Sequence, residues 1–318
     1  MKKKCLIVCW YGKIPEYFPF WEQSCSFNTD YDFIIFTDQR LKIGSKNIFV
    51  VNKTMRSMNE LFSEKLGMDI TIEKPYKFCD FRPAYGVIFE DYIKEYDFWG
   101  HCDLDVIFGN ISNFITEDIL NNYEIINMNG HFKLYANTEK INHLYELKGS
   151  KFDYKTVFMS KYNYAFDEFT GINLIAKYNH IKTILINEFA DISVKHSRFL
   201  CANSKNYFYQ IYVFCAGSLY KCYYDQNDQL FQQEKMYLHF QKKHPKINID
   251  SNCENYSIGS SGLNYYSKDL SKEYITVYNR FVSNSFEKKE IVTYYFKQFL
   301  KLISSSLNEK WIWIRKRL

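Results

Sequence analysis

The chain has 318 residues, of which 47% are hydrophobic, so it is long enough to bury a large core in one large or two small domains. Its nine cysteines include no C-x-x-C pair and no paired metal spacing, which favours reduced thiols in a cytoplasmic protein. The formal net charge is +5, and residues 285–318 account for all of it with eight basic and three acidic residues. Because a nucleic-acid-binding face would spread positive charge over the fold, we expect no nucleic-acid partner.

The first apolar run, residues 5–10, follows three lysines but is too short for a signal peptide and lacks a cleavage pattern. We therefore expect it to be the first strand of the domain. The chain contains no uninterrupted stretch of about 18 apolar residues, so a transmembrane helix is not expected.

Strand-like and helical patterns alternate along the amino-terminal part of the chain. Strands are expected at 5–10, 31–38 and 47–52, and helices at 19–27 and 58–66. This alternation predicts a mostly parallel sheet with helices on its faces. Ligands bind outside the carboxyl ends of such strands, where Tyr11, Gly12 and Asp38 are expected to lie. Asp38 is equally compatible with an ordinary turn cap.

A charged cluster within the sequence KFCDFRPAYG precedes the next helical pattern. Pro83 suits the first position of a helix that continues to Ile93. The amino terminus of this helix would attract anions, and Lys77 and Arg82 would add to its field. The alternative is a pair of solvated cations held by Asp80.

An apolar run beginning at Tyr96 ends in two aspartates that are one residue apart. Side chains alternate along a strand, so Asp103 and Asp105 are expected to point the same way where the strand meets a loop. Two carboxylates in this position suit a hard divalent cation, Mn²⁺ or Mg²⁺, with positions left open for a substrate's phosphates. A motif this short also occurs as a loop cap or a solvated turn.

Two further acids, Asp167 and Glu168, lie between aromatic residues just before a helical pattern. A carboxylate enclosed by aromatic side chains can have its pKa raised toward a value useful for a general base. The alternative is a simple pair of acids at the start of a helix.

A hairpin is expected at 212–224, and the apolar strand after it carries His239. A histidine on such a strand is more often a core residue than a ligand, but Lys242 and Lys243 follow at a distance that could reach one bound anion. A neutral imidazole can complete a mostly oxygen site for Mn²⁺, while ammonium groups offset phosphate charge.

The C-terminal segment predicts an amphipathic helix with basic residues, including Lys297 and Lys301, opposite an apolar stripe. The stripe comprises Ile291, Val292, Tyr295, Phe296, Phe299, Leu302 and Ile303. This pattern is typical of a helix that lies in a membrane interface, at the cytoplasmic face in this case. A helix that docks on the domain and leaves its basic face in water would show the same pattern.

The ordered set of motifs resembles bacterial GT-A glycosyltransferases of the kind found in surface-polysaccharide gene clusters. The resemblance covers roughly residues 4–245, and its strength lies in the order of the motifs, since none of them is unique. The motifs are a strand ending in Tyr-Gly, then Phe-Thr-Asp, Lys-x-x-Asp-x-Arg-Pro, Trp-Gly-x-x-Asp-x-Asp, Phe-Asp-Glu and Tyr-Leu-His-Phe-Gln-Lys-Lys.

The resemblance implies a GT-A fold, an α/β Rossmann-like, mostly parallel sheet with helices on both faces and an acceptor-side subregion. Together with the amphipathic pattern of the tail, it predicts a catalytic domain at residues 1–284 and a basic helical segment at residues 285–318. It also implies a nucleotide-diphosphate sugar donor, expected to be a UDP-sugar, and a glycan or lipid-linked acceptor. The implied metal ligands are Asp103, Asp105 and His239. The other implied contacts are Tyr11, Gly12, Asp38, Lys77, Asp80, Arg82 and Asp103 on the donor side, Lys242 and Lys243 at the leaving diphosphate, and Asp167 or Glu168 at the acceptor.

Three other functions would use some of the same residues. A phosphotransferase of the haloacid-dehalogenase type normally carries Asp-x-Asp after its first strand, before a Thr or Gly turn, whereas here Val106 and Ile107 follow the motif. A non-catalytic sugar- or nucleotide-binding protein would be free to lose the acids that this chain retains. A peripheral membrane scaffold would need only the tail. Whether the sugar is transferred with inversion or retention stays open.

Overall fold

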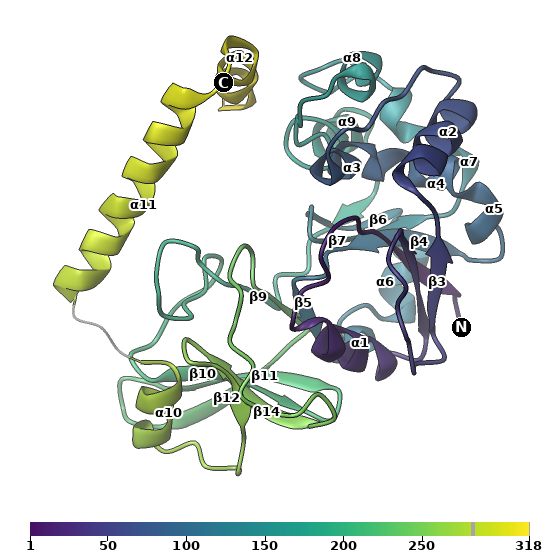
Figure 1. Cartoon of the computed structure of the whole chain (residues 1–318). Coiled ribbons are helices and arrows are strands. Elements are labelled where there is room, and N and C mark those ends of the chain that lie inside the picture. Colours follow the sequence, from purple (N-terminus) through teal and green to yellow (C-terminus); the bar gives the residue numbers. More distant parts are fainter. Residues whose placement is uncertain (281–283, 318) are drawn as a thin grey trace.

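The computed structural model describes residues 1–280 and 284–317, so residues 281–283 and 318 of the predicted domain and tail lie outside the described residues. A seven-stranded sheet in the order β3-β2-β1-β4-β7-β6-β8 forms its largest layer (Figure 1). The strands are β1 Lys4–Cys9, β2 Tyr31–Thr37, β3 Ile48–Asn52, β4 Phe98–Cys102, β6 Ile125–Asn129, β7 Phe132–Ala136 and β8 Thr183–Ile184. Only β7 runs against its neighbours. The predicted α/β class with a mostly parallel sheet is confirmed.

The strands at the centre of this sheet are buried on both faces, which explains their continuous apolar sequences. On one face Ile7 packs in a cluster with Phe62 of helix α2, which covers Met55–Leu66. On the other face Leu6 packs with Trp21 of helix α1, which covers Phe18–Ser26. Every residue of β4 is buried, so the link that carries Asp103 and Asp105 starts from the core of the sheet.

The single helix expected from Pro83 to Ile93 is wrong. The chain instead forms short segments: 3₁₀ turns at Pro75–Lys77 and Arg82–Ala84, and helices α3 Phe78–Phe81, α4 Tyr85–Ile88 and α5 Glu90–Ile93. The backbone leaves helical geometry at Ala84 (φ −99°, ψ 4°) and again at Phe89 (φ −107°, ψ 21°), so the segments do not join into one helix. Because aligned peptide dipoles do not accumulate over four residues, the anion-attracting helix terminus expected here is wrong as well.

Two smaller sheets follow the main one along the chain. Strands β5 Val106–Phe108, β13 Tyr237–His239 and β9 Phe189–Asp191 form a three-stranded sheet in that order. Strands β10 Gln210–Cys215, β11 Ser218–Tyr224, β12 Leu230–Lys235, β14 Asn255–Gly259 and β15 Gly262–Tyr265 form an antiparallel sheet. The predicted hairpin is confirmed as β10 and β11, and its turn residues Ala216 and Gly217 both have positive φ, as a tight two-residue hairpin requires.

Shorter helices complete the body of the molecule. They are α6 Glu117–Asn122, α7 Glu139–Asn142, α8 Tyr154–Met159, α9 Ile172–Tyr178 and α10 Lys272–Tyr278, with 3₁₀ turns at Ile111–Asn113 and Leu144–Glu146.

The C-terminal segment forms two helices, α11 Asn284–Ser304 and α12 Leu307–Arg317. Figure 1 shows α11 extending along one side of the molecule, from about the level of β9 to α12. Helix α12 docks on the domain, because Ile312 is buried in the main core cluster and Lys316 Nζ donates to the Asn163 carbonyl at 2.8 Å. In contrast, Phe296 and Phe299 of α11 are 59% and 57% exposed. Among the helices of the described residues, none combines the length and the apolar sequence that a membrane span requires.

Candidate functional site

Three residues that the sequence marked as metal ligands come together at the carboxyl end of β4. Asp103 and Asp105 lie in the link from β4 to β5, and β5 pairs with β13 so that Val106 is opposite His239. This register places His239 Nε2 3.4 Å from Asp105 Oδ1. One ligand atom from each of Asp103, Asp105 and His239 lies within 4.8 Å of the others.

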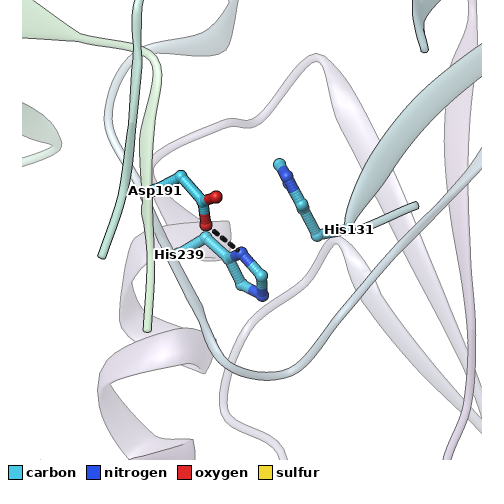
Figure 2. A group of neighbouring side chains, drawn as sticks. All are labelled: His131, Asp191 and His239. Atoms are coloured by element: carbon cyan, nitrogen blue, oxygen red, sulfur yellow. Dashed lines mark hydrogen bonds and ion pairs between the residues drawn. The ribbon is translucent and has the colours of Figure 1, made fainter. Parts of the chain in front are cut away.

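Asp191 and His131 flank the same histidine (Figure 2). Strand β9 pairs with β13 in the register that sets Asp191 beside His239, and His239 Nδ1 lies 2.8 Å from Asp191 Oδ1. With Nδ1 held by this carboxylate, Nε2 is directed toward Asp105. His131, at the tip of the β6–β7 hairpin, stacks on His239 with ring centroids 4.2 Å apart.

The charges in this group depend on one another. Burial opposes the charged form of His239, but hydrogen bonds to Asp105 and Asp191 outweigh it and raise its pKa to about 10. Burial raises the pKa of Asp105 above its ordinary value, with His239 acting in the opposite direction. The pKa of His131 is far below its ordinary value because the side chain is buried. At neutral pH His239 is therefore an imidazolium between two carboxylates, and a cation bound at Nε2 would replace its proton.

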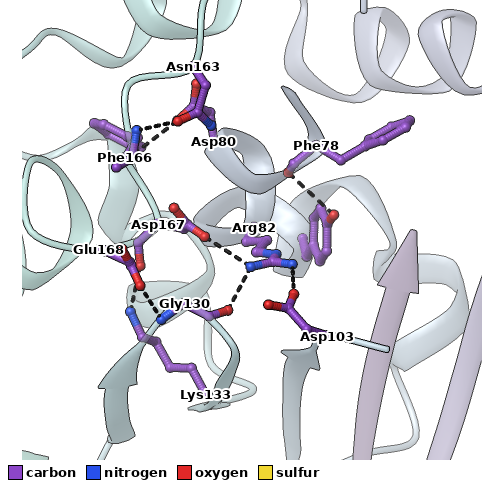
Figure 3. A network of polar contacts seen from close by, with 12 residues as sticks. Phe78, Asp80, Arg82, Asp103, Gly130, Lys133, Asn163, Phe166, Asp167 and Glu168 are labelled. Atoms are coloured by element: carbon purple, nitrogen blue, oxygen red, sulfur yellow. Dashed lines mark hydrogen bonds and ion pairs between the residues drawn. The ribbon is translucent and has the colours of Figure 1, made fainter. Parts of the chain in front are cut away.

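Arg82 connects this group to the predicted general base (Figure 3). Its Nη2 donates to Asp103 Oδ1, and its Nη1 donates to Asp167 Oδ2 at 3.1 Å and to the Gly130 carbonyl at 2.6 Å. The guanidinium fixes two carboxylates at once, which a lysine could not do with the same geometry.

The two neighbouring acids differ in their surroundings. Asp167 is buried, which raises its pKa to about 7, although Arg82 acts to lower it. Glu168 Oε1 accepts the N–H of Gly130 at 2.7 Å, and this bond fixes the hairpin tip. Lys133, also buried, donates to the Asp167 carbonyl at 2.6 Å, and burial lowers its pKa to about 8. The carboxyl group with a pKa suited to proton transfer at neutral pH is therefore that of Asp167.

A cleft of about 660 Å³ opens in front of these residues. The ring of Tyr11, in its wall, stacks on Phe78 with centroids 5.2 Å apart, and its hydroxyl donates to the Lys53 carbonyl at 2.9 Å. Helix α11 contributes Tyr294 and Gln298 to the wall. The predicted site residues that line the cleft are Tyr11, Arg82, Asp103, Asp105, Asp167, Glu168, His239 and Lys242.

Lys77 and Asp80 do not line the cleft. They form a buried ion pair at 2.8 Å, and Lys77 also donates to the carbonyls of Val157 and Tyr162. The Asp80 carboxylate accepts the backbone N–H of Tyr164 at 2.9 Å. The alternative of two solvated cations is wrong for Lys77, because its side chain is buried. Its ion pair with Asp80 fastens the segment before Asp167 to α3.

Three other predicted residues also lie outside the cleft wall. Lys243 Nζ donates to the carbonyls of His196 and Ser197 and so holds that loop. Asp38 is exposed and accepts a hydrogen bond from Gln39 Nε2 at 2.8 Å. Gly12 takes a φ of 122° in the turn after β1, a conformation that favours glycine.

Three side chains of the site are not predicted from the sequence: Asp191, His131 and Lys133. Asp191 ends a three-residue strand, and an acid at the end of an apolar strand is the same signal that singled out Asp38. That signal could have found it. The positions of His131 and Lys133 depend on pairing within the β6–β7 hairpin, and their sequence carries no motif.

A profile described as "Family of unknown function (DUF6625)" matches residues 6–267. The chain belongs to the DUF6625 family. No functionally curated protein matches this DUF6625 member. Among solved structures it is similar to a galactosyltransferase, LgtC, in complex with donor and acceptor sugar analogs, with a TM-score of 0.38 and 10% sequence identity over 90% of this chain and 99% of that chain.

Proposed function

We propose that this protein is a glycosyltransferase that binds a nucleotide-diphosphate sugar, expected to be a UDP-sugar, with the help of Mn²⁺ or Mg²⁺. It would transfer the sugar to a glycan or lipid-linked acceptor in the synthesis of a bacterial surface polysaccharide. The observation that carries the proposal is the convergence of Asp103, Asp105 and His239 at the carboxyl end of the central strand β4, in the wall of a large cleft.

The residues present fit a hard divalent cation, because two carboxylates and one imidazole form an oxygen-rich ligand set. His131, Asp191 and His239 form a second possible group. It is the weaker candidate, since Asp191 is outside the cleft wall and its carboxylate already holds His239 Nδ1. When bound, the cation would offset the negative charge that develops on the departing diphosphate.

The chain's own residues take the remaining roles in the proposal. Lys242, in the cleft wall, would add positive charge near the diphosphate, while Arg82 keeps Asp103 in position. Tyr11, in the cleft wall, would lie on the donor side. If the reaction inverts the configuration at the anomeric carbon, Asp167 would take the proton from the acceptor hydroxyl. A reaction that retains this configuration would not require the base.

Calorimetric titration of the full chain with UDP, with and without Mn²⁺, tests the proposal. We expect binding that depends on the metal, followed by hydrolysis of at least one UDP-sugar. The absence of binding for UDP, GDP and CDP, both with and without metal, would contradict it. Tight binding without turnover of any sugar nucleotide and acceptor would instead favour a non-catalytic binding protein.

Asp191 provides a test of the metal group that does not depend on activity. Asp191→Asn removes the charged acceptor that orients His239, and we expect the affinity for Mn²⁺ alone to fall about 10- to 100-fold. Electron paramagnetic resonance of Mn²⁺ in the absence of nucleotide measures this affinity. Asp69→Asn, the same change at an exposed acid, is the control and should leave the affinity unchanged. Equal affinities of Asp191→Asn and the control would show that Asp191 does not position a ligand.

We further propose that α11 attaches the protein to an anionic membrane surface, at the cytoplasmic face. Supporting this proposal, Phe296, Phe299 and Ile303 are exposed and share one face of a helix that also carries lysines. Substituting Phe296→Ser together with Phe299→Ser should weaken co-sedimentation with vesicles containing phosphatidylglycerol about tenfold or more. Phe49→Ser with Met159→Ser, which removes two exposed apolar side chains elsewhere, should bind as the wild type does. Equal effects of the two pairs would argue against attachment through α11.

A further inference from the structure

A second cavity, of about 400 Å³, lies between residues 194–197 and helix α11. Its wall includes Val194 and Tyr294, which also line the large cleft, so the two hollows adjoin. The polar side chains that line it are Lys195, His196, Ser197, Lys289, Glu290, Thr293 and Lys297.

The charges around this cavity are mainly positive. Lys195 Nζ donates to the Tyr295 hydroxyl at 2.6 Å, and within the described part of the chain no carboxylate pairs with Lys289 or Lys297. The Glu290 carboxylate already has a partner, because both of its oxygens accept the backbone N–H of Ser197 at N···O distances of 3.2 Å. Three lysines therefore line a hollow whose one glutamate is already engaged, an arrangement that favours an anion.

The loop that forms the opposite wall has an unused polar atom. His196 Nδ1 is enclosed and has no hydrogen-bond partner among the described residues. The loop itself is held in place by Lys243, which donates to two of its carbonyls. The wall is thus a fixed surface, and an anion with several oxygens bound against it would be held by the lysines of the cavity.

Helix α11 presents different residues to three different surroundings. Lys289 and Lys297 line the second cavity, Tyr294 and Gln298 line the cleft, and Phe296 is exposed on the outer side. A group bound in the cavity would consequently lie next to both the cleft and any membrane that the exposed side contacts.

We propose that this cavity binds the phosphate or diphosphate head of a lipid-linked acceptor, an inference that rests on the proposed glycosyltransferase function. A phosphate or diphosphate that joins a lipid to a glycan stays anionic at neutral pH and keeps unesterified acceptor oxygens. Lysine ammonium groups bind such a head as point charges, and the lipid chain would leave toward the exposed apolar side of α11. The glycan attached to the head would then extend into the adjoining cleft, toward Asp167.

Vesicle binding by the full chain tests the inference without nucleotide or metal. Phosphatidylcholine vesicles containing a long-chain polyprenyl phosphate are compared with vesicles containing phosphatidylglycerol at equal surface charge. We expect the wild type to bind the polyprenyl phosphate vesicles about tenfold more tightly, which is the effect of one to two favourable lysine contacts. Lys289→Gln with Lys297→Gln should abolish this preference.

Lys288→Gln with Lys301→Gln is the matched control, because it removes the same charge from the same helix at lysines outside the cavity. It should weaken binding to both kinds of vesicle equally and keep the preference. No preference in the wild type, or equal loss of preference in both double variants, would overturn the proposal. Failure of UDP to bind would count against the glycosyltransferase function but leave this vesicle result unchanged, so the two failures are distinguishable.

Discussion

Replacing Asp105 with asparagine is expected to lower the affinity for UDP in the presence of Mn²⁺ by about 100-fold or more and to abolish sugar transfer. The substitution keeps the size of the side chain but removes the charge that a divalent cation requires. It also removes one of the two carboxylates that hold His239. Calorimetry with UDP and Mn²⁺ measures the first effect, and release of UDP from sugar nucleotides measures the second.

Asp69→Asn is again the control, since it makes the same change at an exposed acid. Thermal unfolding of both variants shows whether the fold survives. Metal-dependent UDP binding that Asp105→Asn leaves intact would remove Asp105 from the metal site and, with it, the main support for the proposed function.

The stability of Asp105→Asn without metal should depend on pH in a defined direction. The pKa of His239 in the folded protein, about 10, is above its ordinary value near 6.5, so its ion pairs stabilise the fold fully below pH 6.5. This contribution is lost as the pH rises through about 10. The variant should therefore be less stable than the wild type at neutral pH, and the difference should shrink toward pH 10.

The sequence predicted the part of the site that depends on short-range patterns. Asp103 and Asp105 follow a buried strand, and alternation along a strand was enough to place them together. The strand that carries His239 was also recognisable, but its position beside Asp105 is set by the β5–β13 register, which joins distant parts of the chain. Asp191 reaches the same histidine through a second register, between β9 and β13. Pairings of this kind leave no signal in the local sequence.

Some residues predicted for the site lie outside the cleft wall, and the reason is related. Lys77 and Asp80 form a charged pattern that resembles a ligand site, but each is enclosed by backbone groups from residues 157–166. Lys243 likewise finds carbonyl partners in a loop that the sequence does not place next to it. Residue type showed that these side chains need partners. The fold decides whether the partner is a ligand or the protein's own backbone.

Asp167→Asn is expected to slow turnover by about 10² to 10⁴-fold if the reaction proceeds with inversion, the range that general-base catalysis contributes. Hydrolysis of a sugar nucleotide provides the assay, because water then takes the place of the acceptor hydroxyl. Burial raises the pKa of Asp167 to about 7, and the base must be ionised to accept a proton. For the wild type, kcat/KM should therefore rise about tenfold per pH unit below 7 and level off above it.

Glu168→Gln is the matched control for this dependence. The amide oxygen can still accept the Gly130 N–H, so the hairpin tip stays in place while the charge next to Asp167 is lost. Because Glu168 acts to raise the pKa of Asp167, the rise in kcat/KM should move to lower pH in this variant without a large loss of rate. If kcat/KM of Asp167→Asn kept the pH dependence of the wild type, a group other than Asp167 would be responsible for that dependence. An unchanged rate together with an unchanged profile would remove Asp167 from proton transfer and favour a retaining reaction, in which the acceptor proton leaves without this carboxylate.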